Sequence, residues 1–200
     1  MSTISASLSA SRAFRSLLVA VLVAAAYGDG SAQGTRLLRD PDVAAGGIVF
    51  VHANDIWLAG RDGGTVRRLT SADGAETDPS FSPDGRWIAF TGEYAGNADV
   101  YVVESTGGQP RRLTWHPGAD VVQGWTPDGE VLFRSGRTGQ PTKLWQFYTV
   151  SVEGGYPEAL ALPQAYEGEM SADARWIAYQ EIGQWDAEWR NYRGGQAQPV

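Results

Sequence analysis

The stretch Phe81-Ser82-Pro83-Asp84-Gly85-Arg86-Trp87-Ile88-Ala89-Phe90 decides the fold, because the chain repeats it. A second copy runs from Trp125 to Phe133, and a more divergent copy runs from Met170 to Tyr179. The aspartates of the three copies are 44 and then 45 positions apart: Asp84, Asp128 and Asp173. A fixed spacing of this length is typical of repeat proteins.

Two further phrases keep the same spacing. A glycine pair recurs as Gly63-Gly64, Gly107-Gly108 and Gly154-Gly155. The phrase Arg-Arg-Leu-Thr ends at Thr70 and again at Thr114. A period of forty-odd residues with short strands and regular turn signals predicts a β-propeller, in which each repeat is one blade of four antiparallel strands.

The second repeat shows the expected strands most clearly: Asp78 to Ser82, Trp87 to Gly92, Asp99 to Glu104, and Pro110 to Thr114. Its first turn is Ser82-Pro83-Asp84-Gly85, where proline presets φ and glycine accepts the left-handed conformation. The fourth repeat has Ser171-Ala172-Asp173-Ala174 at this point, without proline or glycine. We therefore expect a weaker hairpin there.

The first 32 residues predict a signal peptide. Arg12 and Arg15 precede an apolar run from Leu17 to Ala26, followed by small residues and a plausible cleavage point after Ala32. The run is too short for a membrane span, which needs about twenty residues, although an uncleaved N-terminal anchor is the alternative. The absence of cysteine suits an exported protein, periplasmic or secreted, that is stabilised by sheet packing.

Residues 33–200 are then expected to form the N-terminal part of an all-β, incomplete propeller of about three and a half blades, near 38–70, 78–114, 120–160 and 168–200. The third strand of the last blade should follow Gly194-Gly195, and it is missing before Val200. Since a propeller closes with about four to eight blades, we expect the chain to be a fragment of a longer protein.

Several phrases, in their order and spacing, carry a family resemblance: Leu38-Arg39-Asp40-Pro41-Asp42, Asn54-Asp55-Ile56-Trp57, Phe90-Thr91-Gly92-Glu93-Tyr94, His116-Pro117-Gly118-Ala119-Asp120, Gly124-Trp125-Thr126-Pro127-Asp128-Gly129 and Tyr192-Arg193-Gly194-Gly195. From about Leu37 to Gly195 the chain resembles the N-terminal propeller of tricorn-type serine peptidases, including their exported bacterial homologues. The Ser-Pro-Asp-Gly unit alone is shared with TolB, prolyl oligopeptidase relatives and many other propellers.

The resemblance implies a large oligomeric peptidase in which a six-bladed and a seven-bladed propeller precede a PDZ-like domain and the catalytic domains. It also implies that the propellers gate or filter peptides. Because the family's catalytic residues lie in those later domains, we expect no catalytic, cofactor-binding or metal-binding residue in this chain, and no cofactor. Two alternatives remain: a non-enzymatic TolB-like periplasmic propeller that binds envelope proteins, and the propeller cap of a prolyl-oligopeptidase-type hydrolase.

The charge of the chain restricts the classes of molecule that it is expected to bind. The net charge of −7, without a basic stripe, disfavours nucleic acid. We expect several carboxylates to lie in connections at one end of the blades, where they would form either a charged mouth that steers basic peptides or an ordinary solvated surface. These carboxylates are Asp73, Glu76, Asp78, Glu93, Asp120, Glu167 and Glu169. They lack the spacing of an EF-hand calcium loop.

The remaining candidates are histidines and tryptophans. We interpret both histidines, His52 and His116, as structural, because the chain has no Gly-x-Ser-x-Gly nucleophile elbow. Most tryptophans are expected to pack between blades, as Trp87 and Trp176 would at equivalent strand starts. Trp185 and Trp189 differ, since they lie in the long 182–195 connection, which is our candidate contact loop.

Overall fold

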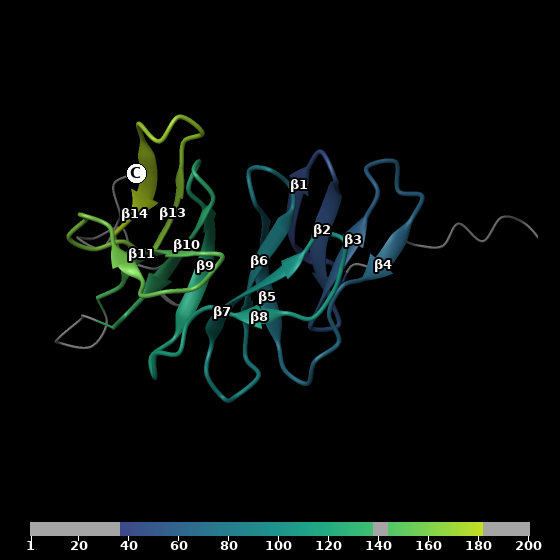
Figure 1. Cartoon of the computed structure of the whole chain (residues 1–200), viewed down its shortest axis with the longest axis horizontal. Helices are drawn as coiled ribbons and strands as arrows, with labels where there is room; N and C mark the ends of the chain where they lie inside the picture. Colours follow the sequence, from purple (N-terminus) through teal and green to yellow (C-terminus); the bar gives the residue numbers. More distant parts are fainter. Residues whose placement is uncertain (1–36, 138–143, 182–200) are drawn as a thin grey trace, which may run out of the picture. The chain divides into compact units, whose positions relative to one another are not determined.

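The computed structural model describes residues 37–137 and 144–181, and every regular element in these residues is a β-strand (Figure 1). The strands form three four-stranded antiparallel sheets and one two-stranded sheet, each in chain order. Within the described residues no helix has the length and apolar character needed to cross a membrane. The all-β prediction, with successive four-stranded blades, is confirmed.

We number the sheets as blades. The first blade contains β1 (Arg39–Ala44), β2 (Gly47–His52), β3 (Asp55–Ala59) and β4 (Val66–Arg68). The second contains β5 (Glu76–Phe81), β6 (Trp87–Gly92), β7 (Asp99–Glu104) and β8 (Arg111–Arg112). The third contains β9 (Asp120–Trp125), β10 (Glu130–Ser135), β11 (Gln146–Ser151) and β12 (Glu158–Ala159). The fourth is described by β13 (Glu167–Met170) and β14 (Ile177–Gln180).

The core lies between the blades rather than within one of them. Strands β6 and β7 are buried along almost their whole length, because a sheet covered on both faces has no solvent side. One cluster joins the first two blades through residues such as Ile56 and Phe90. A second cluster joins the second and third blades through Val102 and Phe133, and a third packs Phe147 of β11 against Tyr179 of β14. Each blade therefore depends on its neighbour for burial of its apolar side chains.

The first strands of successive blades lie next to one another. Strand β5 contacts both β1 and β9, and β9 also contacts β13. The fourth strands β4, β8 and β12 lie at the opposite edges of their sheets and are only two or three residues long. Short edge strands limit unwanted pairing with other chains. The surface shared by the first strands is consequently where side chains from several blades meet.

The Ser82-Pro83-Asp84-Gly85 turn forms as predicted. The Gly85 N–H donates to the Ser82 carbonyl at 2.8 Å, and Gly85 has φ +71°. The fourth hairpin forms as well: β13 and β14 pair over four residues, and the Ala174 N–H donates to the Ser171 carbonyl at 2.9 Å. Ala174 takes φ +56° to close this turn. The turn geometry is thus kept even where the residue is not glycine.

Two expectations on individual elements were wrong. The first strand of the second blade begins at Glu76, two residues before the predicted Asp78, because Glu76 and Thr77 already pair with Gly92 and Thr91. Trp176 does not pack as Trp87 does. Its side chain is 72% exposed, whereas Trp87 is half-buried and lies against the second core cluster.

Candidate functional site

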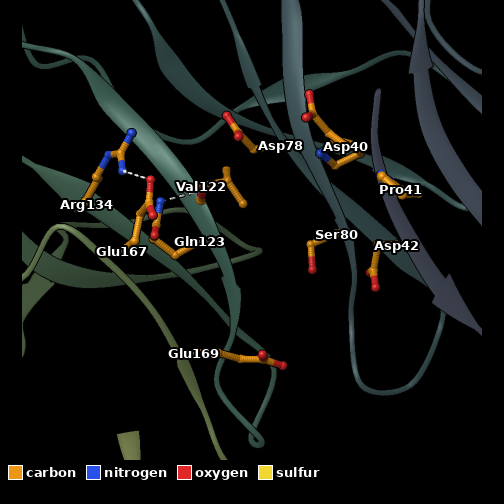
Figure 2. A pocket seen from close by; sticks show the side chains of 11 residues that line it. Asp40, Pro41, Asp42, Asp78, Ser80, Val122, Gln123, Arg134, Glu167 and Glu169 are labelled. Carbon is orange, nitrogen blue, oxygen red and sulfur yellow. Dashed lines mark hydrogen bonds and ion pairs between the residues drawn. The ribbon is translucent and has the colours of Figure 1, made fainter. Parts of the chain in front are cut away.

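A cavity of about 370 Å³ opens on the surface of the first strands (Figure 2). Its lining comes from β1, β5, β9, β10 and β13, so four blades contribute. Five of the lining side chains are carboxylates, and one is a guanidinium: Asp40, Asp42, Asp78, Glu167, Glu169 and Arg134. We call this the inner-strand cavity. Its excess of carboxylates gives it a negative potential, which attracts cationic groups.

The backbone at two of these carboxylates is unusual. Asp40 and Asp78 precede Pro41 and Pro79 and have φ of +48° and +54°. A residue before proline is ordinarily extended, and non-glycine residues seldom take positive φ. Both lie where the pairing of the first strand with the second is interrupted. The interruption re-aims side chains in the same way in both blades, and it brings the two aspartates to the same cavity.

Side chains on the first strands also hold these strands to one another. Asp42 Oδ2 accepts the Phe81 N–H at 2.7 Å, which links β1 to β5. The Trp125 indole N–H donates to the Ser80 carbonyl at 3.0 Å, which links β9 to β5. Gln123 Oε1 accepts the Gly168 N–H at 3.3 Å, which links β9 to β13. The cavity floor is therefore cross-linked rather than assembled from independent strands.

Arg134 contributes a cation to the lining. It lies on β10 and donates to the Tyr166 carbonyl at 2.9 Å. It also pairs with Glu167 at 3.6 Å (Figure 2). Its guanidinium also lies over the rings of Tyr166 and Trp145, 4.0 and 5.3 Å from their centroids. These contacts fix the guanidinium at the junction of the third and fourth blades. Glu167 is thereby partly neutralised, and the carboxylates of β1 and β5 lie on other strands of the lining.

The predicted acidic face is only partly correct. Asp78, Glu167 and Glu169 line the cavity, although they lie in β5 and β13 and not in connections. Asp73 and Glu93 are exposed in connections, outside the lining.

The prediction that Glu76 and Asp120 lie in connections at an acidic end of the blades was wrong. Both side chains are fully buried at the first positions of β5 and β9. Asp120 pairs with Arg137 at 2.7 Å, and Glu76 accepts hydrogen bonds from the first blade. Burial raises the pKa of Glu76, whose hydrogen bonds from Thr70, Tyr94 and Ile56 oppose that rise. Glu76 thus lies in the contact between the first two blades, and Asp120 forms an ion pair within the third blade.

The lining residues Asp40, Asp42, Gln123 and Arg134 were not singled out from the sequence. One signal was available for the first of them, since the Asp-Pro dipeptide of Asp40-Pro41 returns as Asp78-Pro79 in the equivalent strand. The contribution of Arg134 had no such signal, because it depends on β10 meeting β13 across a blade boundary.

The two histidines have structural surroundings. His116 Nδ1 accepts the Gly118 N–H at 2.9 Å and so closes its own loop. The His52 ring packs edge-on against Trp57, with centroids 5.8 Å apart, and its carbonyl accepts the Trp57 indole N–H. Neither histidine lines the inner-strand cavity. The predicted contact loop 182–195, with Trp185 and Trp189, lies outside the described residues.

A second hollow of about 310 Å³ lies between the turn ends of the second and third blades. Its lining combines the two repeat turns with aromatic side chains, among them Pro83, Trp87, Trp125 and Pro127. Trp125 is buried, and its indole N–H is taken by Ser80. The two hollows thus differ in character, one acidic along the first strands and one partly aromatic at the turns.

Among curated proteins, the chain is similar in sequence to TolB proteins. The chain is similar to the Tol-Pal system protein TolB of Francisella tularensis subsp. mediasiatica, with 38% identity over 122 residues, covering 58% of this chain and 27% of that protein. It is also similar to the protein TolB homolog of Chlorobium luteolum, with 40% identity over 55 residues, 28% of this chain and 13% of the relative. The chain thus spans about a quarter or less of the length of these relatives.

Solved structures and a family model point to the same fold. The crystal structure of the tricorn protease matches with a TM-score of 0.60 and 27% identity, over 68% of this chain and 14% of that one. TolB from Acinetobacter baumannii matches with a TM-score of 0.56 and 30% identity, over 72% and 37%. Residues 35–200 match the family model of the tricorn protease N-terminal beta propeller domain. The chain belongs to the family of tricorn protease N-terminal β-propeller domains.

Proposed function

We propose that this chain is the first propeller region of an exported, tricorn-like serine peptidase, and that it handles polypeptide segments without cleaving them. The observation that carries the proposal is the family match over residues 35–200. The inner-strand cavity adds a place where a segment could be held, because four blades contribute polar side chains to one concave surface. Chemistry would then belong to domains encoded beyond this chain.

A TolB-like role is the second candidate, and a specific observation favours it. The identity of 38% over 122 residues to TolB of Francisella tularensis exceeds the 27% identity to the tricorn protease structure. In that role the propeller would be a protein-binding module of the cell envelope, with no peptidase activity. Both candidates share a propeller that binds polypeptide, and they differ in what the gene encodes after Val200.

Sequencing the gene beyond the Val200 codon separates the two candidates. The peptidase proposal expects further forty-odd-residue repeats and then a serine peptidase core. A reading frame that ends after a single propeller would overturn it and favour the TolB-like role. A Gly-x-Ser-x-Gly elbow on a strand-to-helix turn would instead identify a prolyl-oligopeptidase-type enzyme.

Binding to the inner-strand cavity can be measured on this chain by fluorescence anisotropy with an unstructured lysine-rich peptide. We expect binding that weakens as salt rises and that decreases in the variant Asp78→Asn/Glu169→Gln, because the cavity loses two carboxylates. The matched control is Glu93→Gln/Glu158→Gln, which removes two exposed carboxylates outside the lining. Equal loss in both variants would mean that the peptide senses only net charge.

Export is part of the proposal and has its own test. The apolar run from Leu17 to Ala26 after Arg12 and Arg15 supports a signal peptide cleaved after Ala32. Expression of the full reading frame in a bacterial host, followed by mass spectrometry of the envelope fraction, should find Gln33 as the first residue. An intact Met1 in that fraction would identify an uncleaved anchor instead.

A further inference from the structure

Glu76 is a fully buried carboxylate in the contact between the first and second blades. Its Oε2 accepts the Ile56 N–H of β3 at 2.9 Å and the Thr70 hydroxyl that follows β4. Its Oε1 accepts the Tyr94 hydroxyl, which belongs to the second blade. The Glu76 backbone N–H donates to the Asn54 carbonyl at 3.1 Å. One side chain therefore gathers donors from both blades, and we call Glu76 with Ile56, Thr70 and Tyr94 the first-joint cluster.

No cation compensates this carboxylate within residues 37–137 and 144–181. Asp55 of β3 repels the Glu76 carboxylate and is itself paired with Arg68 at 2.7 Å. Strand β6 carries no charged residue, and the connection after it carries Glu93 and Tyr94. The other strands packed on β5 carry these titratable or charged groups: Arg39, Asp40 and Asp42 in β1, His52 in β2, Asp55 in β3 and Asp120 in β9.

The third and fourth blades have other residues at the position equivalent to Glu76. It is 44 residues further on at Asp120 and 45 more at Ala165, in register with the turn aspartates. Asp120 has Arg137 at 2.7 Å, and Ala165 is buried without any charge. A buried ion carries a large desolvation cost unless a charged partner offsets it, and an apolar residue carries no such cost. Among the three positions, Glu76 is the one that is buried with hydrogen bonds alone, so its protonation state affects the joint directly.

We propose that the first-joint cluster is a proton-dependent latch, in which neutral Glu76 holds the first two blades together and ionised Glu76 loosens them. A neutral carboxyl keeps every contact in the cluster. Oε2 still accepts from Ile56 and Thr70. The contact with Tyr94 is kept with its direction reversed, because the proton on Oε1 is donated to the Tyr94 oxygen. Ionisation adds an uncompensated charge at the same place.

The direction of the effect follows from the environment of the side chain. Burial, aided by repulsion from Asp55, raises the pKa of Glu76 in the folded protein above its ordinary value. A group of this kind adds stability below its unfolded-state pKa, and that contribution is lost as the pH rises through the folded-state pKa. The joint is therefore tighter below the folded-state pKa of Glu76 and looser above it.

The test compares the chain with its variant Glu76→Gln, an uncharged isostere, by hydrogen exchange between pH 4.5 and 8. Protection of the Ile56 amide, corrected for the intrinsic exchange rate, should fall with rising pH in the parent. It should stay nearly level in Glu76→Gln. Glu158→Gln, an exposed carboxylate on β12, is the control and should behave as the parent does. Parallel pH profiles in the parent and in Glu76→Gln would overturn the latch.

A second measurement does not depend on whether Glu76→Gln folds. The carboxyl carbon of Glu76, followed by NMR in the parent, should titrate above the ordinary glutamate range. Tyr94→Phe removes a donor that favours the ionised form, so it should move this titration to higher pH. A Glu76 carboxyl that titrates in the ordinary range, or one that Tyr94→Phe leaves in place, would refute the proposal.

Discussion

The guanidinium of Arg68 on β4 lies 2.7 Å from the carboxylate of Asp55 at the start of β3. The second blade repeats this pair at 2.7 Å between Arg112 and Asp99. In the third blade, Ala159 pairs with Tyr148 as Arg112 pairs with Tyr101, so Ala159 takes the place of the arginine. Gln146, two residues before Tyr148, takes the place of the aspartate. Both members of the ion pair are replaced together, so in the three blades whose four strands are described the pair is either complete or absent.

Arg112→Ala should destabilise the protein by about 3 kcal/mol, because it leaves the fully buried Asp99 without its cation. Burial already raises the pKa of Asp99, and Arg112 opposes that rise. Urea unfolding at pH 7 measures the change. The double variant Asp99→Gln/Arg112→Ala copies the third blade and should recover much of the loss. A double variant less stable than Arg112→Ala would show that the pair is not the cause.

The turn of the fourth hairpin offers a stabilising change. Ala174 and Gly85 occupy the same turn position and have φ of +56° and +71°. A side chain in this region costs about 1 kcal/mol relative to glycine. Ala174→Gly should therefore raise the free energy of unfolding by up to that amount. Gly85→Ala should lower the free energy of unfolding by a similar amount. An added Cβ there meets nothing within 4 Å, so the backbone conformation is the source of this cost. Thermal melting of both variants tests whether backbone conformation alone decides this turn.

Much of the second blade could be predicted from sequence because its signals are local. Strands β6 and β7 have the predicted bounds, Trp87–Gly92 and Asp99–Glu104. Alternating β-branched and aromatic residues and a proline-glycine turn act within a few positions. The repeated sequence then predicts the same strands in the other blades. Equivalent hydrogen bonds agree with this, since the amides of Ile56 and Val100 each donate to a threonine hydroxyl, at 2.9 and 3.0 Å.

The environment of the carboxylates could not be predicted in this way. Glu76 is buried between strands of two blades, where Ile56, twenty positions earlier, donates its amide to the carboxylate. Asp78 lines the cavity because its backbone turns to positive φ before a proline, against the local preference of such a residue. The first feature depends on a contact between blades and the second on an uncommon backbone conformation, and local strand and turn propensities specify neither.

Gly47 should be intolerant of any side chain, although its neighbour Gly46 should accept one. An alanine Cβ at Gly47 would lie 2.3 Å from the Ala59 carbonyl oxygen, and φ is +145° there. At Gly46 a Cβ meets nothing within 4 Å. We expect Gly47→Ala to cost about 1 to 3 kcal/mol, as overpacking does, and Gly46→Ala to cost little. Equal denaturation midpoints for the two variants would contradict the close β2–β3 approach.

Asp84 should make stability depend on acid pH. Its Oδ1 accepts the Ser82 hydroxyl at 2.6 Å and the Arg86 N–H at 3.0 Å, and these bonds lower the pKa of Asp84.

A lowered folded-state pKa contributes stability above the unfolded-state pKa, and this contribution is lost as the pH falls through the folded-state value. The melting temperature of Asp84→Asn should therefore lie below that of the parent at pH 6, and the gap should shrink at pH 3. Asp128→Asn is the control, since the Thr126 hydroxyl of that turn donates to the Glu130 carbonyl at 3.4 Å, whereas the Ser82 hydroxyl donates to the Asp84 carboxylate. A gap for Asp84→Asn that stays constant across this range would mean that the carboxylate charge does not stabilise the turn.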